Sequence, residues 1–94
     1  PDQYVLFNNY PNPFNPITHI KFQLPESGAV KMHVYDLNGS LVATLADNQM
    51  YPRGEHILTW NATDNAGNRV STGVYLYRFQ AGQFVKTGKM ILVK

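Results

Sequence analysis

The chain has 94 residues, of which 44% are hydrophobic and 15% charged, a balance typical of one small globular domain and not of a disordered tail. Its net charge is +2 and its eight Lys and Arg residues form no basic run, which argues against nucleic acid or an anionic membrane as a partner. No cysteine is present, which excludes disulfides, thiolate zinc sites and thiol nucleophiles.

The length and the apolar pattern also predict how the chain is organised. We expect residues 1–94 to form a single, monomeric domain. Residues 1–3 resemble the remnant of a linker in a larger protein rather than a signal peptide. No apolar run approaches the roughly 18 residues that a spanning helix needs, so no membrane insertion is expected.

The first half of the chain predicts four strands. A short one is expected at residues 4–7. Apolar and polar residues then alternate over residues 19–24 and over residues 30–34, which is the period of a strand with one buried face. Asn38-Gly39 predicts a tight hairpin, because both residues tolerate positive φ, and residues 41–46 then form the returning strand.

The second half predicts three more strands. The first of them places His56, Leu58 and Trp60 on one face. The predicted segments of this half are a loop at residues 50–54, a strand ending at Trp60, a polar Asn/Asp loop at 61–68, a strand at 74–80, a turn at 81–83 and a strand at 84–93.

This succession of short strands indicates the fold class. Turns recur about every 8–12 residues, the spacing expected of an antiparallel sandwich. A parallel sheet would need helical crossovers, and no segment can supply one. We therefore predict an all-β fold, an immunoglobulin-like antiparallel β-sandwich of about seven strands.

Two places depart from simple alternation. Residues 8–16, the Pro/Asn segment, hold three prolines, which cannot donate a ladder hydrogen bond. We expect extended chain laid over the sandwich here, anchored by Tyr10 and Phe14 at the edge of the core. Gly73 precedes a strand, and we expect a backbone conformation there that is closed to other residues.

Metal binding finds weak support. His19, His33 and His56 lie on strands without a second histidine at metal-binding spacing, which favours exposed positions for the first two and a partly buried one for His56. The best oxygen-rich cluster lies in the polar loop, and Ca²⁺ takes such ligands. Asn and Asp also favour turns, and we prefer that interpretation. The predicted metal site is none, with weak candidates Asp64, Asn65 and Asn68.

Catalytic and cofactor motifs are also missing. No serine lies in a nucleophile-elbow motif, and no phosphate-binding glycine motif occurs. We expect no enzyme, no catalytic residue and no cofactor. Exposed aromatic platforms could bind sugars, but most aromatic residues follow the buried phase of their strands. We assign to the core Trp60, Tyr75, Tyr77 and Phe79, and consider Tyr35 and Tyr51 more exposed.

Four segments resemble a known family. Tyr4-Val5-Leu6 followed by Asn9-Tyr10-Pro11-Asn12-Pro13-Phe14-Asn15-Pro16 resembles the opening of type A C-terminal sorting domains of type IX secretion. The family's later motifs are resembled, in the same order, by Val34-Tyr35-Asp36-Leu37-Asn38-Gly39, by Thr72-Gly73-Val74-Tyr75-Leu76-Tyr77-Arg78 and by Lys89-Met90-Ile91-Leu92-Val93-Lys94. The resemblance covers residues 4–94.

The resemblance implies that the domain is an address at the end of a larger exported bacterial protein. Such a protein passes through the periplasm, and its folded terminal domain is recognised by the outer-membrane type IX translocon. A sortase-like protease often removes the domain, and the cargo is released or held at the cell surface. The implied recognition residues are Tyr10, Pro11, Asn12, Pro13, Phe14, Asn15, Pro16, Gly73, Tyr75, Lys89, Met90, Leu92, Val93 and Lys94.

A more specific hypothesis concerns the last hairpin, residues 74–94. We expect it to supply much of the recognised surface, with an exposed edge on the terminal strand that pairs with a partner. Deleting residues 89–94 is then expected to trap the parent protein in the periplasm.

Two alternatives remain open at this stage. The segment from Trp60 to Gly67 is similar to a loop of the Ig-like domain in flagellar hook-capping proteins, although Asn61 replaces an Asp of that pattern. That likeness supports the sandwich fold more than a flagellar role. The other alternative is an accessory Ig-like spacer or carbohydrate-binding module of an extracellular hydrolase.

Overall fold

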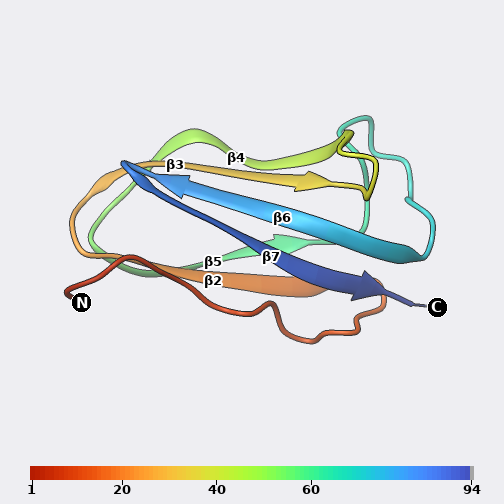
Figure 1. The fold of residues 1–94 in the computed structure, drawn as a ribbon, viewed down its shortest axis with the longest axis horizontal. Helices are drawn as coiled ribbons and strands as arrows, with labels where there is room; N and C mark the ends of the chain where they lie inside the picture. Colours follow the sequence, from red (N-terminus) through yellow and green to blue (C-terminus); the bar gives the residue numbers. More distant parts are fainter. Residues whose placement is uncertain (94) are drawn as a thin grey trace.

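The computed structural model describes residues 1–93 and forms two antiparallel β-sheets packed face to face (Figure 1). The predicted all-β sandwich is confirmed, including the short first strand. A three-stranded sheet has the order β1-β2-β5, and a four-stranded sheet has the order β4-β3-β6-β7. The strands are β1 (Val5–Leu6), β2 (Thr18–Leu24), β3 (Gly28–Tyr35), β4 (Leu41–Tyr51), β5 (Gly54–Trp60), β6 (Gly73–Ala81) and β7 (Phe84–Leu92). No helix long enough to cross a membrane occurs among these residues.

The core lies between the sheets because alternate residues of each strand point inward. On β6, Tyr75, Tyr77 and Phe79 are buried, as the alternation predicted. Phe22 of β2 meets Phe79 across the sandwich, with ring centroids 5.0 Å apart. Aromatic side chains bury more apolar area than any others, so contacts of this kind hold the two sheets together.

The β3–β4 hairpin is confirmed, but its turn differs from the prediction. Gly39 has φ of 84°, whereas Asn38 does not adopt positive φ. The Asp36 carboxylate accepts hydrogen bonds from the Asn38 and Ser40 N–H groups at 2.9 and 3.0 Å, and the Gly39 N–H donates to the Asp36 carbonyl. The side chain of Asp36 therefore shapes a longer turn that needs only one residue with positive φ.

The predicted loop at residues 50–54 is wrong in extent. Strand β4 continues through Tyr51, which pairs with Gly28 at the far end of β3. Register shifts and the positive φ of Asn48, 54°, interrupt the alternation of β4, and this irregularity hid its second half from sequence analysis. Only Pro52 and Arg53 lie between β4 and β5.

His33 was expected to be exposed and is half-buried, so that expectation was wrong. Tyr35 and Tyr51 are half-buried and thus more exposed than the buried aromatic residues of the core, as predicted, and the Tyr51 ring packs edge-on against Phe22 at 5.2 Å. Tyr51 is covered because it ends the part of β4 that was expected to be a loop. His56 is partly buried against Tyr51, as predicted. Gly73 has φ of 152°, which confirms the expected conformation.

Candidate functional site

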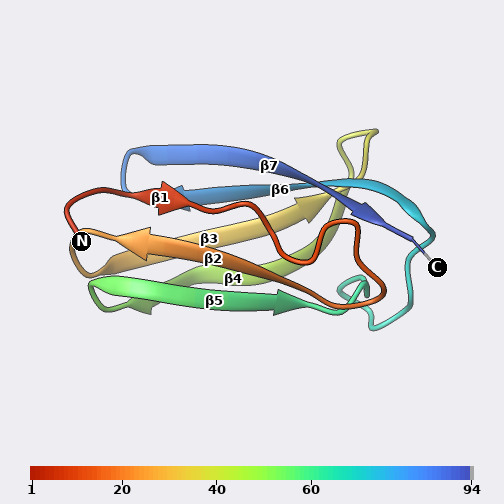
Figure 2. The same cartoon turned by 90° about the horizontal axis from the view of Figure 1, so that it is seen from below.

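The Pro/Asn segment, residues 8–16, runs from β1 to β2 of the three-stranded sheet and lies beside the C-terminal end of β7 (Figure 2). Its bridges reach both sheets, through Tyr10 to β2 and through Phe14 to β7. It holds three cis peptide bonds, each preceding one of its prolines. A parallel bridge joins Phe14 to Leu92, although these residues are far apart in the sequence. The two ends of the chain therefore form one continuous surface, which we call the end surface and define as residues 9–18 with Lys89–Val93.

Asn12 pairs with the edge of β7 through its side chain. Its Nδ2 donates to the Lys89 carbonyl at 3.2 Å, and its Oδ1 accepts from the Ile91 N–H at 3.0 Å. A carboxamide offers one donor and one acceptor side by side, so it reproduces the pairing of a strand's own peptide group. Proline residues flank Asn12, and the second of them could not supply the backbone donor.

Phe14 continues this pairing with its backbone. Its N–H donates to the Ile91 carbonyl at 2.9 Å, and its carbonyl accepts from the Val93 N–H at 3.0 Å. Its ring is 2% exposed and packs against Trp60, which confirms Phe14 as an anchor. The expectation of a free edge at the end of β7 is therefore wrong, because the outward groups from the Lys89 carbonyl to the Val93 N–H are already bonded.

Asn9 fixes the start of the end surface and was missed by sequence analysis. Its side chain is buried and donates to Thr18 Oγ1 at 2.9 Å, while Thr18 in turn donates to the Pro11 carbonyl at 2.8 Å. Its N–H donates to the hydroxyl of Tyr77 at 3.1 Å. Asparagine is usually a surface residue, and no local pattern in the sequence marks this one as buried.

Tyr77 reaches across β7 to make that contact. Its hydroxyl also donates to the Phe7 carbonyl at 3.2 Å. Burial raises the pKa of the Tyr77 phenol, and the Asn9 N–H opposes this by a smaller amount. Gly88 pairs with Tyr77, and a Cβ at Gly88 would lie 2.2 Å from Tyr77 Cζ. Glycine at position 88 therefore makes room for the ring that holds the end surface.

Tyr10 was expected to be an anchor, and that prediction is wrong. Its side chain is 79% exposed, and only its backbone is tied down, through two hydrogen bonds of 2.9 Å with His19. The buried position belongs to the preceding residue, Asn9, because the backbone pairing with β2 turns the Tyr10 ring to solvent. Together with Phe7 and Ile57, Tyr10 lines a shallow apolar depression.

The other implied recognition residues divide between the core and the surface. Met90 and Leu92 are buried, and Tyr75 and Gly73 pair with them on β6. These four support the end surface from inside. Lys94 lies outside the described residues. Those that reach solvent are Pro11, Asn12, Pro13, Asn15, Lys89 and Val93, with Pro16 half-buried.

The polar Asn/Asp loop is a hydrogen-bonded turn. Asp64 Oδ1 accepts from the Ala66 and Asn68 N–H groups at 3.0 and 2.9 Å, and Asn65 Oδ1 accepts from the Thr44 N–H at 2.8 Å. This arrangement repeats the turn that Asp36 forms in the β3–β4 hairpin. The Oδ1 atoms of Asp64 and Asn65 are thus engaged by the backbone, as the turn interpretation expects.

The comparisons with known proteins agree with this architecture. The chain shares 24% identity and a TM-score of 0.77 with dimeric latent PorU from Porphyromonas gingivalis, over 99% of this chain and 9% of that one. It shares 22% identity and a TM-score of 0.65 with PorZ, a surface component of the type IX secretion system of the same organism, over 95% of this chain and 11% of that one. This chain thus spans about a tenth of each. Comparison with curated proteins gives no match.

The fold and the end surface define a small β-sandwich module that closes its N-terminal segment onto its last strand. The sequence model of the secretion system C-terminal sorting domain matches residues 8–94, nearly the whole chain. The chain belongs to this family, and its role is that of a C-terminal sorting signal in type IX secretion. A sorting domain is not itself catalytic, and the family implies export to the cell surface or beyond.

Proposed function

We propose that the domain acts as the address of a larger exported protein and that the outer-membrane translocon reads its end surface. The cargo precedes residue 1, crosses the periplasm with the domain, and carries any catalytic activity of the parent protein. The domain acts as a single, monomeric unit over residues 1–94. A sortase-like protease removes it after translocation.

The observation that carries this proposal is the set of hydrogen bonds that holds the end surface in place. A flexible recognition segment loses affinity because it must be ordered on binding. Here the Pro/Asn segment is fixed by Asn12 and Phe14 to β7 and by Asn9 to Tyr77. The segment is therefore already ordered, and its exposed side chains, above all Tyr10, are presented without further cost in conformational freedom.

The structure also decides how the proposal should be tested. Deleting residues 89–94 would remove Met90 and Leu92 from the core, so the domain would unfold and the loss of export would have two explanations. Substitution of an exposed residue avoids this problem. Tyr10 and Met50 are both large and exposed, at 79% and 67%, and only Tyr10 belongs to the end surface.

The experiment uses a reporter that carries a signal peptide and ends in this chain, in a bacterium with a type IX system. Tyr10→Ala is expected to lower the fraction of reporter outside the cell and raise the fraction in the periplasm. Met50→Ala should be exported like the unmodified reporter. Equal export of both variants would contradict the role of the end surface, and failure of the unmodified reporter would contradict the proposed function.

A further inference from the structure

The outer face of the four-stranded sheet is basic. Because Val30, Met32 and Val34 of β3 are buried, the residues between them point to solvent. The same reasoning applies to β6, where Tyr75, Tyr77 and Phe79 are buried, and to β7, where Met90 and Leu92 are buried. The resulting set, which we call the basic face, comprises Lys31, His33, Arg78 and Lys89 together with Tyr35, Leu76, Thr87 and Ile91.

The strand register brings Lys31, Arg78 and Lys89 close to one another. Lys31 lies opposite Gln80, Arg78 opposite Thr87 and Lys89 opposite Leu76, so that Arg78 is the diagonal neighbour of both lysines. Neighbours in such a register are roughly 5–8 Å apart, and like charges at that separation destabilise a sheet. The Arg78 guanidinium stays on this face through a 3.2 Å hydrogen bond to Gln80.

The cations of the basic face have no acidic partner within residues 1–93. The single ion pair of that part of the chain joins Lys21 to Glu55 on the other sheet. Asp47 of the edge strand β4 is exposed, but it forms no ion pair with Lys31. Of the chain's six acidic residues, none lies on β3, β6 or β7.

The composition of the face favours a protein as its partner. Tyr35, Leu76 and Ile91 are half-buried and form an apolar patch beside Arg78 and Lys89, at the end of the face away from Lys31. Protein interfaces are enriched in aromatic residues and Arg at their centres. A polyanionic polymer would draw mainly on the charges and would leave these apolar side chains unused.

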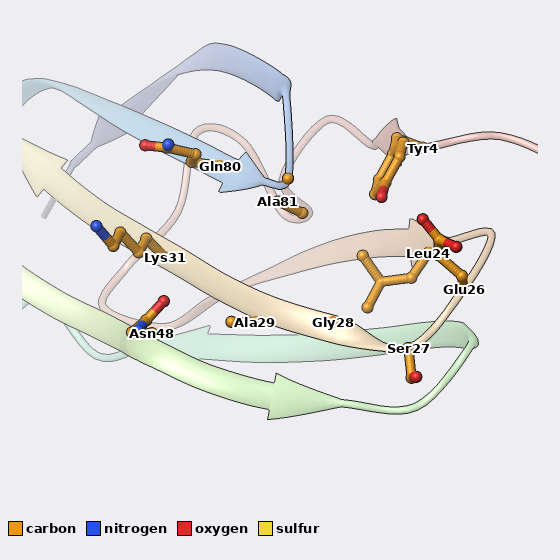
Figure 3. Close-up of a pocket in the computed structure, with 11 residues that line it drawn as sticks. Tyr4, Leu24, Glu26, Ser27, Gly28, Ala29, Lys31, Asn48, Gln80 and Ala81 are labelled. Carbon is orange, nitrogen blue, oxygen red and sulfur yellow. The ribbon is translucent and has the colours of Figure 1, made fainter.

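A cleft adjoins the basic face at the end near the N-terminus. It has a volume of about 390 Å³, and Lys31 and Gln80 line one side of it (Figure 3). Leu24 lies deeper, between the sheets, and Tyr4 and Glu26 also line the cleft, with the Tyr4 ring stacked on Phe84 at the start of β7. The cleft gives an otherwise flat sheet a recess next to Lys31, where a side chain of a partner can be held.

We infer that the basic face is a docking site for an acidic protein surface, one that presents Asp or Glu residues to Lys31, Arg78 and Lys89 and apolar side chains to the patch of Tyr35, Leu76 and Ile91 beside them. The inference rests on the proposed sorting function and extends the recognised surface from the end surface, with which the basic face shares Lys89 and Ile91, across the four-stranded sheet. Because rim charges act mainly on the rate of association, the interaction is expected to weaken as salt is raised.

The first test is charge reversal in the exported reporter. The variant K31E/R78E/K89E is expected to lower export by about tenfold or more, because the face would then repel an acidic partner. The variant K31R/R78K/K89R keeps the three positive charges and should be exported nearly as well as the unmodified reporter. Arg69→Glu reverses an exposed cation outside the three strands and is the matched control. Circular dichroism and thermal unfolding of each purified chain separate loss of binding from loss of folding.

The second test identifies the partner by photo-crosslinking in exporting cells. A benzoylphenylalanine replaces Thr87, which is exposed between Arg78 and Lys89, or Pro52, which is exposed in the β4–β5 turn. Crosslinks from Thr87 to Asp- and Glu-rich peptides are expected, and they should vanish in the charge-reversed chain. The Pro52 position should give none of them.

Each of three other results would overturn the inference. Unchanged export of a folded K31E/R78E/K89E reporter would do so while the sorting function stands, since the unmodified reporter is exported. A Thr87 product that resists proteases and contains sugar would assign the face to an anionic polysaccharide. Crosslinked peptides without acidic residues would remove the charge argument.

Discussion

Tyr77 combines two roles in one side chain. Its ring belongs to the core of β6, while its hydroxyl accepts from the Asn9 N–H and donates to the Phe7 carbonyl. A hydrogen bond in a buried place contributes little net energy but costs much when one partner is removed. The hydroxyl therefore matters for the start of the Pro/Asn segment and the residue before it more than for the core itself.

The first prediction concerns Tyr77→Phe. At neutral pH the change should lower the free energy of unfolding by about 1–3 kcal/mol, because the Asn9 N–H keeps its buried position without an acceptor. Urea unfolding at pH 7 measures this difference. An unchanged midpoint would show that water replaces the hydroxyl at Asn9.

The second prediction concerns the pH dependence of stability. Burial raises the pKa of Tyr77 above its ordinary value of 10.0, so the folded state holds the phenol proton more tightly than the unfolded chain does. The stability from this group is fully present below about pH 10 and is lost as the pH rises through the folded pKa. Urea unfolding between pH 8 and 11 should show a smaller alkaline loss in Tyr77→Phe. Parallel curves for the two chains would contradict it.

The third prediction concerns Gly88→Ala. The new Cβ would collide with the Tyr77 ring, and moving that ring would disturb both hydrogen bonds of its hydroxyl. We expect a loss of about 1–3 kcal/mol, as for other overpacked sites. Gly28→Ala is the control, because nothing lies within 4 Å of its Cβ position. Equal midpoints for the two variants in urea would contradict the steric argument.

Among the elements, β7 and the Pro/Asn segment depend on each other. An edge strand with unpaired peptide groups invites pairing with other chains. The segment covers the last part of β7 from the Lys89 carbonyl to the Val93 N–H, using the Asn12 carboxamide and the Phe14 backbone. A segment rich in proline, which is a poor strand former, thus protects the edge of a sheet.

The fourth prediction tests this protection. Asn12→Ala removes two hydrogen bonds and should lower the free energy of unfolding by about 1 kcal/mol. It should also speed hydrogen exchange at the Ile91 amide, which loses its acceptor. Asn15→Ala, in the same segment and exposed, is the control. Unchanged exchange at Ile91 would show that the carboxamide does not hold the segment.

Regular elements were predictable from local pattern, whereas contacts between distant segments were not. The alternation on β2, β3 and β6 is regular, so their spans and buried faces were predicted well. The second half of β4 was missed because register shifts near Asn48 break its period. Asn9 and Asn12 could be grouped with their neighbours by family resemblance, but their partners, Tyr77 and Ile91, are distant in the sequence. Tyr10 and Phe14 look alike in sequence, and only their pairing with β2 and β7 leaves the first side chain exposed and the second buried.

The whole molecule is elongated, with extents of 37 × 22 × 20 Å. The N-terminus lies at one end of the long axis and the C-terminal end of β7 at the other (Figure 1). Cargo joined before residue 1 is therefore held away from the end surface. The address can be read while a large protein is attached.

The fifth prediction follows from this polarity. A compact protein fused after residue 94 is expected to block export of the reporter, because it would lie against the end surface. The same protein fused before residue 1 should be exported. Immunoblots of medium and periplasm compare the two reporters, and a long flexible linker after residue 94 should restore export. Equal export of both compact fusions would contradict the assignment of the end surface.

The bridge between Phe14 and Leu92 makes the end surface depend on both ends of the domain. Its two halves are made at the beginning and at the end of synthesis of the domain, and each is hydrogen-bonded to the other. A chain that stops before β7 lacks one half, and a chain that has not folded has not joined the two, so neither presents the end surface. A partner that reads this surface would therefore bind only a domain that has been synthesised through β7 and has folded.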